Sequence, residues 1–269
     1  YVDVTFGGGG HSREILSRLS AKGHLYSFDQ DADAMQNAPT DGRFTFVRSN
    51  FKFLNNWMRY YGVQQIDGLL ADLGVSSHHF DDDARGFSFR FDAPLDMRMN
   101  QLGGRTAADI IATYDEQQLL RLFRLYGEVR QPQRIVRAIL RSREQGEIKT
   151  TGRLAELVGD DKKELARVFQ ALRIEVNGEM AALKQMLSAS QQLLSPGGRL
   201  VVLTYHSLED RLVKNLIRSG NTDGHQEQDI YGLLQSPLRA IGKQQSPSAE
   251  EQQANPRSRS ARLRIAEKR

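Results

Sequence analysis

Residues 2–16 read VDVTFGGGGHSREIL, and this stretch decides how the chain is interpreted. Apolar and polar residues alternate up to Phe6, four glycines follow, and an amphipathic segment begins at His11. The pattern predicts a strand that turns into a helix. Glycine has no Cβ, so a glycine loop at a helix N-terminus lets a ligand lie against the backbone. We therefore expect a ligand site at residues 7–10.

The composition is that of an ordinary globular protein. The chain has 269 residues, of which 39% are hydrophobic and 26% charged, and no run approaches the roughly 18 apolar residues of a membrane span. It contains no cysteine, which excludes disulfides, thiolate metal sites and a cysteine nucleophile, and which fits a reducing cytoplasm. Because the sequence opens inside a strand, we expect the natural N-terminus to lie upstream.

Positive charge gathers at the end of the chain. The formal net charge is only +4, but the last 13 residues hold one acid against Arg257, Arg259, Arg262, Arg264, Lys268 and Arg269. Such a cluster is typical of a protein that binds a polyanion, most simply a nucleic acid. A solvated tail is the alternative.

Strand and helix patterns alternate over the first 75 residues, and a matching strand follows at residue 198. The fold class predicted is α/β, with a Rossmann-like, mostly parallel, doubly wound sheet. Helical patterns fill the interval, which indicates an inserted helical domain. We expect a core domain at 1–102 and 176–269, and a substrate-recognition insertion at 103–175. The alternation in the tail predicts a half-buried edge strand.

The glycine loop selects among nucleotide ligands. A phosphate-binding P-loop needs Lys-Ser or Lys-Thr after its last glycine, and His11-Ser12 stands there instead. The third glycine of a dinucleotide fingerprint falls on Ser12 or Arg13, which weighs against NAD without excluding it. Asp29 ends the second predicted strand, 19 residues after Gly10, where a carboxylate accepts hydrogen bonds from ribose hydroxyls. S-adenosylmethionine, which has a ribose but no pyrophosphate, suits both features.

The fourth predicted strand ends in DLGVSS, residues 72–77. Ligands of doubly wound sheets bind beyond the carboxyl ends of the strands, so Asp72 is expected to face the cofactor and an acceptor amine. The histidines and aspartates of residues 78–83 do not predict a metal site, since adjacent residues seldom converge on one ion. Of Phe87, Phe89 and Phe91, we expect two to be core residues.

At this point the chain resembles a family, the bacterial small-subunit rRNA (cytosine-N4) methyltransferase H family. The motifs that carry the resemblance run in family order: TFGGGGHS, DLGVSS, RGFSF, PLDMRM, FQALRIEVN, SPGGRL, YHSLEDRLVK and NPRSRSARLRIAE. The resemblance implies a class I S-adenosylmethionine-dependent fold and methylation of a cytidine N4 in the decoding region of 16S rRNA. It implies cofactor contacts at Gly9, Gly10, His11, Asp29, Phe51 and Asp72, and at His79 where the family has glutamine.

Substrate contacts are expected on the insertion. Arg130, Arg134, Arg137 and Arg141 recur at helical spacing opposite apolar residues, so they form one stripe that either contacts RNA or is simply solvated. Arg173 and Asn177 share another face, which leads toward the core domain. His206 ends the fifth strand, and with Asp72 it is a candidate to orient the cytosine or accept its proton. Ser207 and Asp210 form a capping-box pattern.

The sequence thus predicts a cytoplasmic enzyme that binds 16S rRNA within the small ribosomal subunit, with no metal and no membrane, and leaves a homodimer open. One alternative is a methyltransferase for another amine, adenine N6 or a DNA cytosine. A non-catalytic RNA-binding assembly factor and an NAD oxidoreductase are the others.

Overall fold

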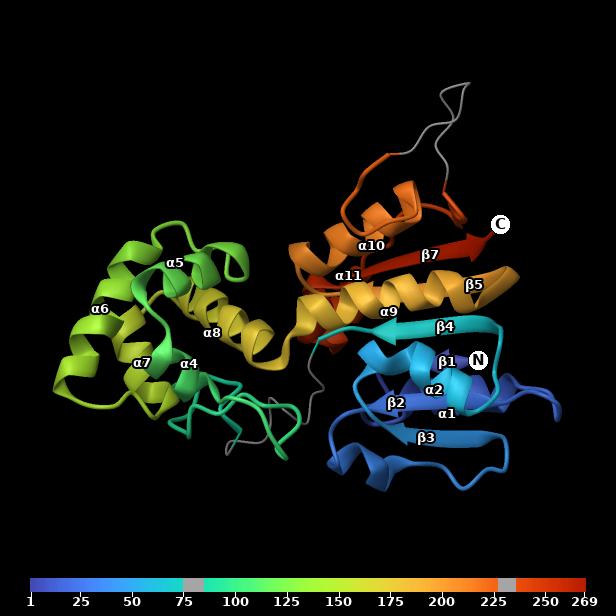
Figure 1. The fold of residues 1–269 in the computed structure, drawn as a ribbon, viewed down its shortest axis with the longest axis horizontal. Helices are drawn as coiled ribbons and strands as arrows, with labels where there is room; N and C mark the ends of the chain where they lie inside the picture. Colours follow the sequence, from blue (N-terminus) through green and yellow to red (C-terminus); the bar gives the residue numbers. More distant parts are fainter. Residues whose placement is uncertain (75–84, 227–235) are drawn as a thin grey trace. The chain divides into compact units, whose positions relative to one another are not determined.

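The structure, a computed structural model, describes residues 1–74, 85–226 and 236–269. The chain divides into two compact units, Tyr1–Gly74 with Met180–Arg269, and Val75–Glu179. Among the described residues, none of the helices has the length and apolar character needed to cross a membrane. The first unit is built on a sheet and the second is helical (Figure 1).

The first unit contains one seven-stranded sheet of order β3-β2-β1-β4-β5-β7-β6 (Figure 1). The first five strands in this order are parallel, whereas β7 is antiparallel to both of its neighbours. The strands are β1 (Val2–Asp3), β2 (Leu25–Asp29), β3 (Phe44–Arg48), β4 (Ile66–Asp72), β5 (Leu194–Thr204), β6 (Leu238–Ala240) and β7 (Arg262–Lys268). The predicted α/β class, with its mostly parallel sheet, is therefore confirmed.

Short helices connect these strands. They are α1 (Gly10–Arg18), η1 (Asp33–Asn37), η2 (Phe51–Phe53), α2 (Leu54–Tyr60), α9 (Glu179–Leu193), α10 (Ser207–Ser219), α11 (Ala249–Ala254) and η4 (Pro256–Ser260). The strand order reverses at β1, because the chain runs outward to β2 and β3 and then returns to β4. Right-handed crossovers on the two sides of such a point lie on opposite faces of the sheet and leave a crevice between them. Ligands of such folds bind at the carboxyl ends of the strands beside this point, which are β1 and β4 here.

The core of the first unit follows from the continuous apolar character of its parallel strands. Val2, Phe28, Leu69 and Val202, from four neighbouring strands, are each at most 2% exposed. The helices contribute apolar side chains to the same cluster. They include Leu54 and Met58 of α2, and Leu183, Met186 and Leu187 of α9. This rigid sheet fixes the strand ends that carry the candidate site.

The second unit consists of α4 (Ala107–Thr113), α5 (Glu116–Leu125), α6 (Pro132–Gln145), α7 (Thr151–Val158) and α8 (Lys162–Asn177). Its helices begin where the sequence supplies caps: Asp115 accepts from the Gln118 backbone N–H, and Thr150 caps α7. Ile135, Val136 and Ile139 are fully buried, which leaves Arg134, Arg137 and Arg141 of α6 exposed. Arg130 precedes α6, which begins at Pro132, so the predicted stripe of four arginines is wrong for Arg130.

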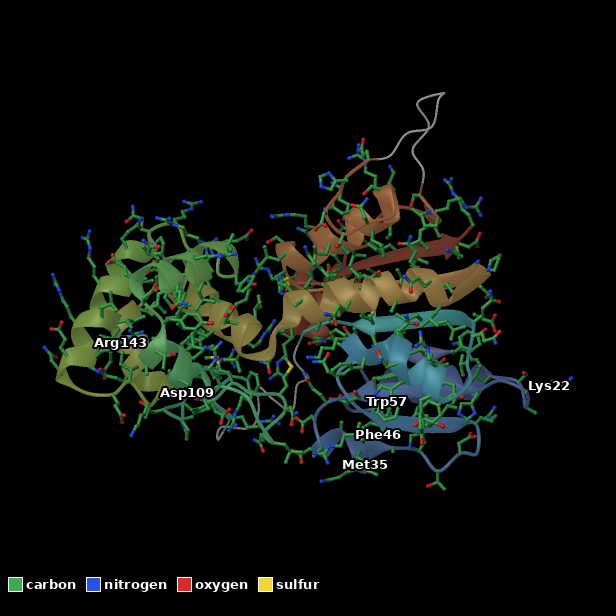
Figure 2. The ribbon with its side chains drawn as sticks, viewed as in Figure 1. Lys22, Met35, Phe46, Trp57, Asp109 and Arg143 are labelled. Atoms are coloured by element: carbon green, nitrogen blue, oxygen red, sulfur yellow. The ribbon has the colours of Figure 1, made fainter. Side chains whose placement is uncertain are left out.

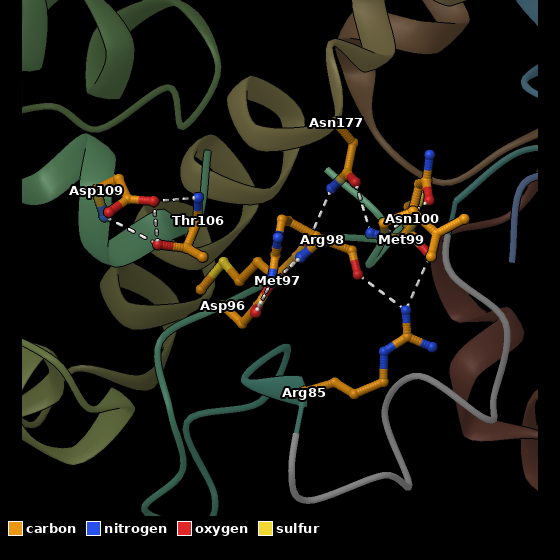
Figure 3. Close-up of polar contacts among 10 residues, drawn as sticks. Arg85, Asp96, Met97, Arg98, Met99, Asn100, Thr106, Asp109 and Asn177 are labelled. Carbon is orange, nitrogen blue, oxygen red and sulfur yellow. Dashed lines mark hydrogen bonds and ion pairs between the residues drawn. The ribbon is translucent and has the colours of Figure 1, made fainter. Parts of the chain in front are cut away.

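The segment before the helices belongs to the second unit, which corrects the expected boundary at residue 102. Leu95, Met97 and Met99 lie in the apolar core of that unit. Met97 has a left-handed backbone, with φ of 62°, that is unusual for a residue with a side chain. The side-chain amide of Asn177 donates to the Met97 carbonyl at 2.9 Å, and its oxygen accepts from the Met99 N–H at 2.8 Å (Figure 3). Asn177 therefore holds this turn onto α8.

The C-terminal strand corrects a second expectation. β7 is not an edge strand, because β6 pairs with it on one side and β5 on the other. Its arginines are also partly committed: Arg264 donates to both carboxylate oxygens of Asp210, at 2.7 and 3.0 Å, and Arg262 donates at 3.0 Å. Asp210 is only 6% exposed, so these ion pairs join α10 to the sheet.

Replacing Asp210 should therefore reduce stability by an amount that depends on pH. Burial alone would raise the pKa of Asp210, but hydrogen bonds from Arg264 and Arg262 outweigh it and lower the pKa below the ordinary 3.8. The stabilisation is present above the unfolded pKa and is lost as pH falls through the folded one. We expect Asp210→Asn to lose roughly 2–3 kcal/mol in urea unfolding at pH 7, and less near pH 3.5. Asp223→Asn, which breaks an exposed ion pair to Lys184, is the control. Equal losses from both variants would contradict this role.

Candidate active site

The glycine loop combines two glycines that the backbone requires with two that it does not. Gly7 and Gly9 have φ angles of 50° and 75°, in the left-handed region. A Cβ on Gly9 would also lie 2.8 Å from the ring of Phe6. Gly9 is the N-cap of α1, so the loop's conformation sets where that helix begins.

Gly8 and Gly10 have no such internal reason. Both are exposed, neither has a positive φ, and a Cβ added to either would have no protein atom within 4 Å. Alanine would be tolerated here by the folded chain alone, and at Gly10, the first residue of α1, it would favour the helix. A ligand against the backbone would supply the missing reason, and the ligand site expected at this loop stays a prediction.

Asp29 ends β2 beside this loop. Its Oδ2 accepts from the Gly7 N–H at 2.8 Å, and its Oδ1 accepts from the Asp31 N–H at 2.9 Å. The carboxylate therefore fixes the loop to the sheet, which the sequence analysis did not foresee. A carboxylate offers about four acceptor positions, so ribose binding by Asp29 is compatible with these bonds and stays a prediction.

Asp72 lies at the carboxyl end of β4, across the switch point from the loop. Its Oδ1 accepts from the hydroxyl of Tyr205 at 2.8 Å, and its Oδ2 lies 3.3 Å from Nε2 of His11. The hydrogen bond to Asp72 raises the pKa of His11, and burial with the nearby Asp72 charge raises the pKa of Tyr205. The carboxylate is thus held from both sides, by a hydroxyl that stays protonated and by an imidazole whose charged form is favoured.

Tyr205 is a site residue that the sequence analysis missed. It follows β5, in which Leu203 pairs with Asp72 of β4, so Tyr205 lies two residues beyond the residue that pairs with Asp72. The signal was the shared end of two adjacent parallel strands.

His206 is the N-cap of α10. Its Nδ1 accepts from the Glu209 N–H at 3.4 Å, and its Nε2 lies 3.2 Å from a carboxylate oxygen of Glu209. The same carboxylate accepts from the N–H groups of Tyr205 and His206. The capping box is therefore His206 with Glu209, not Ser207 with Asp210 as predicted. With a side chain 9% exposed and both ring nitrogens toward Glu209, His206 has a clear structural role.

The other expected cofactor contacts are distributed around the same edge. Phe51 is half-buried and opens η2, directly after β3. Asn50 beside it donates to the side chain of Gln30, which follows β2. His79 lies outside the residues that the structure describes, so its expected contact stays a prediction.

The expected RNA contacts of the second unit separate into free and engaged side chains. Arg130 and Arg137 are exposed, and no hydrogen bond or ion pair joins their guanidinium groups to any residue that the structure describes. Arg134 donates to the Val158 carbonyl and pairs with Glu164. Arg173 forms a nearly buried ion pair with Glu179, at 2.9 Å.

The five parallel strands, the glycine loop and the acids that end β2 and β4 define a methyltransferase of the S-adenosylmethionine-dependent class. The model of the MraW methylase family matches residues 1–269, and the chain belongs to this family.

Relatives resemble the chain over its whole length. A protein of Parabacteroides distasonis, named Ribosomal RNA small subunit methyltransferase H, is 60% identical over 276 residues that cover all of this chain and 90% of the relative. One of Phocaeicola vulgatus with the same name is 58% identical, covering all of this chain and 91% of the relative. Among solved structures, an rRNA methylase from Streptococcus thermophilus aligns with a TM-score of 0.44 and 12% identity, over 99% of this chain and 84% of that one.

The open side of the loop makes a direct prediction for Gly10. Gly10→Ala should leave the melting temperature unchanged or higher, because alanine favours a helix by about 0.5–1 kcal/mol over glycine. It should weaken S-adenosylmethionine binding at least about fivefold, since a methyl group in ligand space costs roughly 1–3 kcal/mol. Calorimetric titration and thermal unfolding measure both. Gly42→Ala, at another open glycine without positive φ, is the matched control. Unchanged affinity in Gly10→Ala would exclude the loop from cofactor binding.

Proposed function

We propose that this chain transfers the methyl group of S-adenosylmethionine to N4 of a cytidine in 16S rRNA of the small ribosomal subunit. The observation that carries the assignment is the pairing of an open glycine loop after β1 with a doubly held carboxylate, Asp72, after β4. The RNA is inferred from the relatives, whose name specifies small-subunit ribosomal RNA, and the cytidine N4 from the family that the sequence motifs resemble.

Residues of the first unit fit the cofactor. Gly8 and Gly10 leave backbone open for close approach, and Asp29 is placed to accept from ribose hydroxyls. Bound S-adenosylmethionine supplies an electrophilic methyl group on a sulfonium. We assign to Phe51 and His11 the remaining contacts that the sequence predicts at this edge.

The acceptor needs orientation more than activation. An exocyclic amine must present its lone pair to the methyl group and afterwards lose a proton. The Asp72 carboxylate can accept a hydrogen bond from the amine and so fix the lone-pair direction. Tyr205 and His11 hold that carboxylate in place. Because His206 is committed to capping α10, a direct role of His206 in proton transfer stays a prediction.

The second unit is proposed to bind the RNA substrate. Arg130, just before α6, and Arg137, on its exposed side, are available for phosphates, while Arg134 is held by Glu164. We also infer that the assembled or nearly assembled subunit in the cytoplasm is the substrate. A homodimer and RNA contacts of Arg173 and Asn177 stay predictions.

The proposal is tested by identifying the product. Unmodified small subunits and naked 16S rRNA are incubated with labelled S-adenosylmethionine, and the RNA is digested to nucleosides for mass analysis. We expect label in N4-methylcytidine. Label in N6-methyladenosine, or only with a DNA substrate, would replace the acceptor. RNA binding without any methyl transfer would favour the assembly-factor alternative.

The role of Asp72 is tested through Tyr205. Tyr205→Phe removes only the hydroxyl that donates to Asp72 Oδ1, and a hydrogen bond to a charged group contributes about 1.5–3 kcal/mol. We expect kcat to fall about tenfold or more, with the affinity for S-adenosylmethionine retained. Tyr26→Phe, in another partly buried tyrosine of the same unit, is the control. A kcat equal to that of the wild type would remove Asp72 positioning from the mechanism.

A further inference from the structure

Residues 43–65 form an unusually basic and aromatic segment. They include no aspartate or glutamate, although the whole chain has 33 in 269 residues. They contain four cations and seven aromatic residues: Arg43, Arg48, Lys52, Arg59, Phe44, Phe46, Phe51, Phe53, Trp57, Tyr60 and Tyr61. Nothing in the proposed chemistry uses this composition beyond Phe51.

The structure sorts this segment into a buried and an exposed face. Leu54 and Met58 of α2 are fully buried, and Trp57 packs against the same core. The opposite side of η2 and α2 is exposed and consists of Lys52, Phe53, Asn56, Arg59 and Tyr60, which we call the α2 face. Their spacing of i, i+1, i+4, i+7 and i+8 places them on one side of a helix. Burial of the apolar side therefore forces the α2 face into solvent.

The aromatic rings of the α2 face are large and exposed. Tyr60 is 76% exposed and Phe53 45% exposed. Core packing does not explain why two large rings are exposed, each next to a cation in the sequence. Lys52 places its ammonium 4.8 Å from the centroid of the Phe53 ring, so a cation and a stacking surface already lie together.

The Tyr60 ring is held in position by its neighbours. It meets Trp57 edge-on at 5.6 Å and Tyr61 edge-on at 5.1 Å between ring centroids. Trp57 in turn stacks on Tyr61 at 5.9 Å, and Figure 2 shows Trp57 on α2. A ring supported in this way loses little conformational entropy when a second ring stacks on it.

The α2 face begins at the edge of the sheet that carries the candidate site. Lys52 and Phe53 lie in η2, directly after the carboxyl end of β3. Arg59 and Tyr60 lie at the far end of α2, about 10 Å further along at 1.5 Å per residue. A chain that leaves the site along β3 would meet first one cation and aromatic ring and then another.

We propose that the α2 face binds unpaired nucleotides of the RNA substrate, with bases stacked on Phe53 and Tyr60 and phosphates paired with Lys52 and Arg59. Interleaved cations and exposed aromatic rings without acids match single-stranded RNA, in which every base has a face to stack and every linkage a negative charge. This inference rests on the proposed rRNA substrate but concerns a surface outside the catalytic residues.

The first arm of the test removes the rings. The double variant Phe53→Ala/Tyr60→Ala should raise the Kd for 16S rRNA and the KM for RNA at least about tenfold, since stacking contributes about 1–3 kcal/mol per base. The kcat and the affinity for S-adenosylmethionine should not change. When Tyr60→Phe replaces Tyr60→Ala in the double variant, the ring is kept, and RNA binding should be partly restored. Tyr1→Ala, at a ring 43% exposed that directly precedes β1 in the first unit, is the matched control.

The second arm removes the charges. Lys52→Gln/Arg59→Gln should weaken RNA binding and reduce the slope of log Kd against log salt by about 1.4, or 0.7 for each single-strand phosphate contact. Arg18→Gln, whose guanidinium side chain is 80% exposed on α1, is the control and should leave the slope unchanged. These surface changes keep the core, and thermal unfolding verifies it.

The outcomes separate the two proposals. If the wild-type enzyme yields no N4-methylcytidine, the proposed function is overturned. The RNA-binding measurements still test the α2 face in that case, because they do not depend on methyl transfer. Active wild-type enzyme whose double variants bind RNA like the controls would overturn the α2 face. Unchanged RNA binding together with an altered mass in analytical ultracentrifugation would identify the face as a protein interface instead, which also overturns the proposal.

Discussion

The candidate site depends on one buried carboxylate, that of Asp3 in β1. Asp3 is fully buried, and its Oδ2 accepts from the Ser12 hydroxyl at 2.6 Å while Ser12 also lies 2.8 Å from the hydroxyl of Ser27. Burial raises the pKa of Asp3, because the charged form of the acid is destabilised away from water. The hydrogen bonds of Asp3 and Ser12 fasten α1 to β1 and β2, so both ends of the glycine loop between β1 and α1 are fixed.

The same carboxylate also reaches the acceptor side of the site. Asp3 Oδ1 accepts from the Thr5 N–H at 3.0 Å, and the Thr5 hydroxyl oxygen accepts from the Asp72 N–H at 2.7 Å. Two strands that meet at the switch point are thereby linked by side chains as well as by their backbone ladder. The cofactor loop and the carboxylate that faces the acceptor are consequently parts of one rigid polar network.

Sequence reasoning was sufficient where one local rule decided the outcome. Apolar alternation and glycine placement located the strands, the loop and the acids that end β2 and β4, because each of these depends on residues close in sequence. It did not find Tyr205, whose role arises only because β5 lies beside β4. It also missed that Asp29 binds the loop it follows, and it placed the α10 cap one residue late, since histidine is an uncommon cap. The unit boundary was misplaced because the burial of Met97 and Met99 depends on Asn177, some 80 residues further along the chain.

The cations illustrate most clearly what sequence does not reveal. The tail and the stretch around α6 are both rich in arginine, yet Arg262 and Arg264 neutralise Asp210, while Arg130 before α6 and Arg137 on α6 remain exposed. A count of charges treats all four alike. The α2 face is the opposite case, because its two cations draw no attention in a chain with 37, and only the absence of acids and the exposure of Phe53 and Tyr60 distinguish it. A polyanion responds to unneutralised charge at the surface, so the electrostatic contribution to RNA binding follows from which acids each cation has as neighbours.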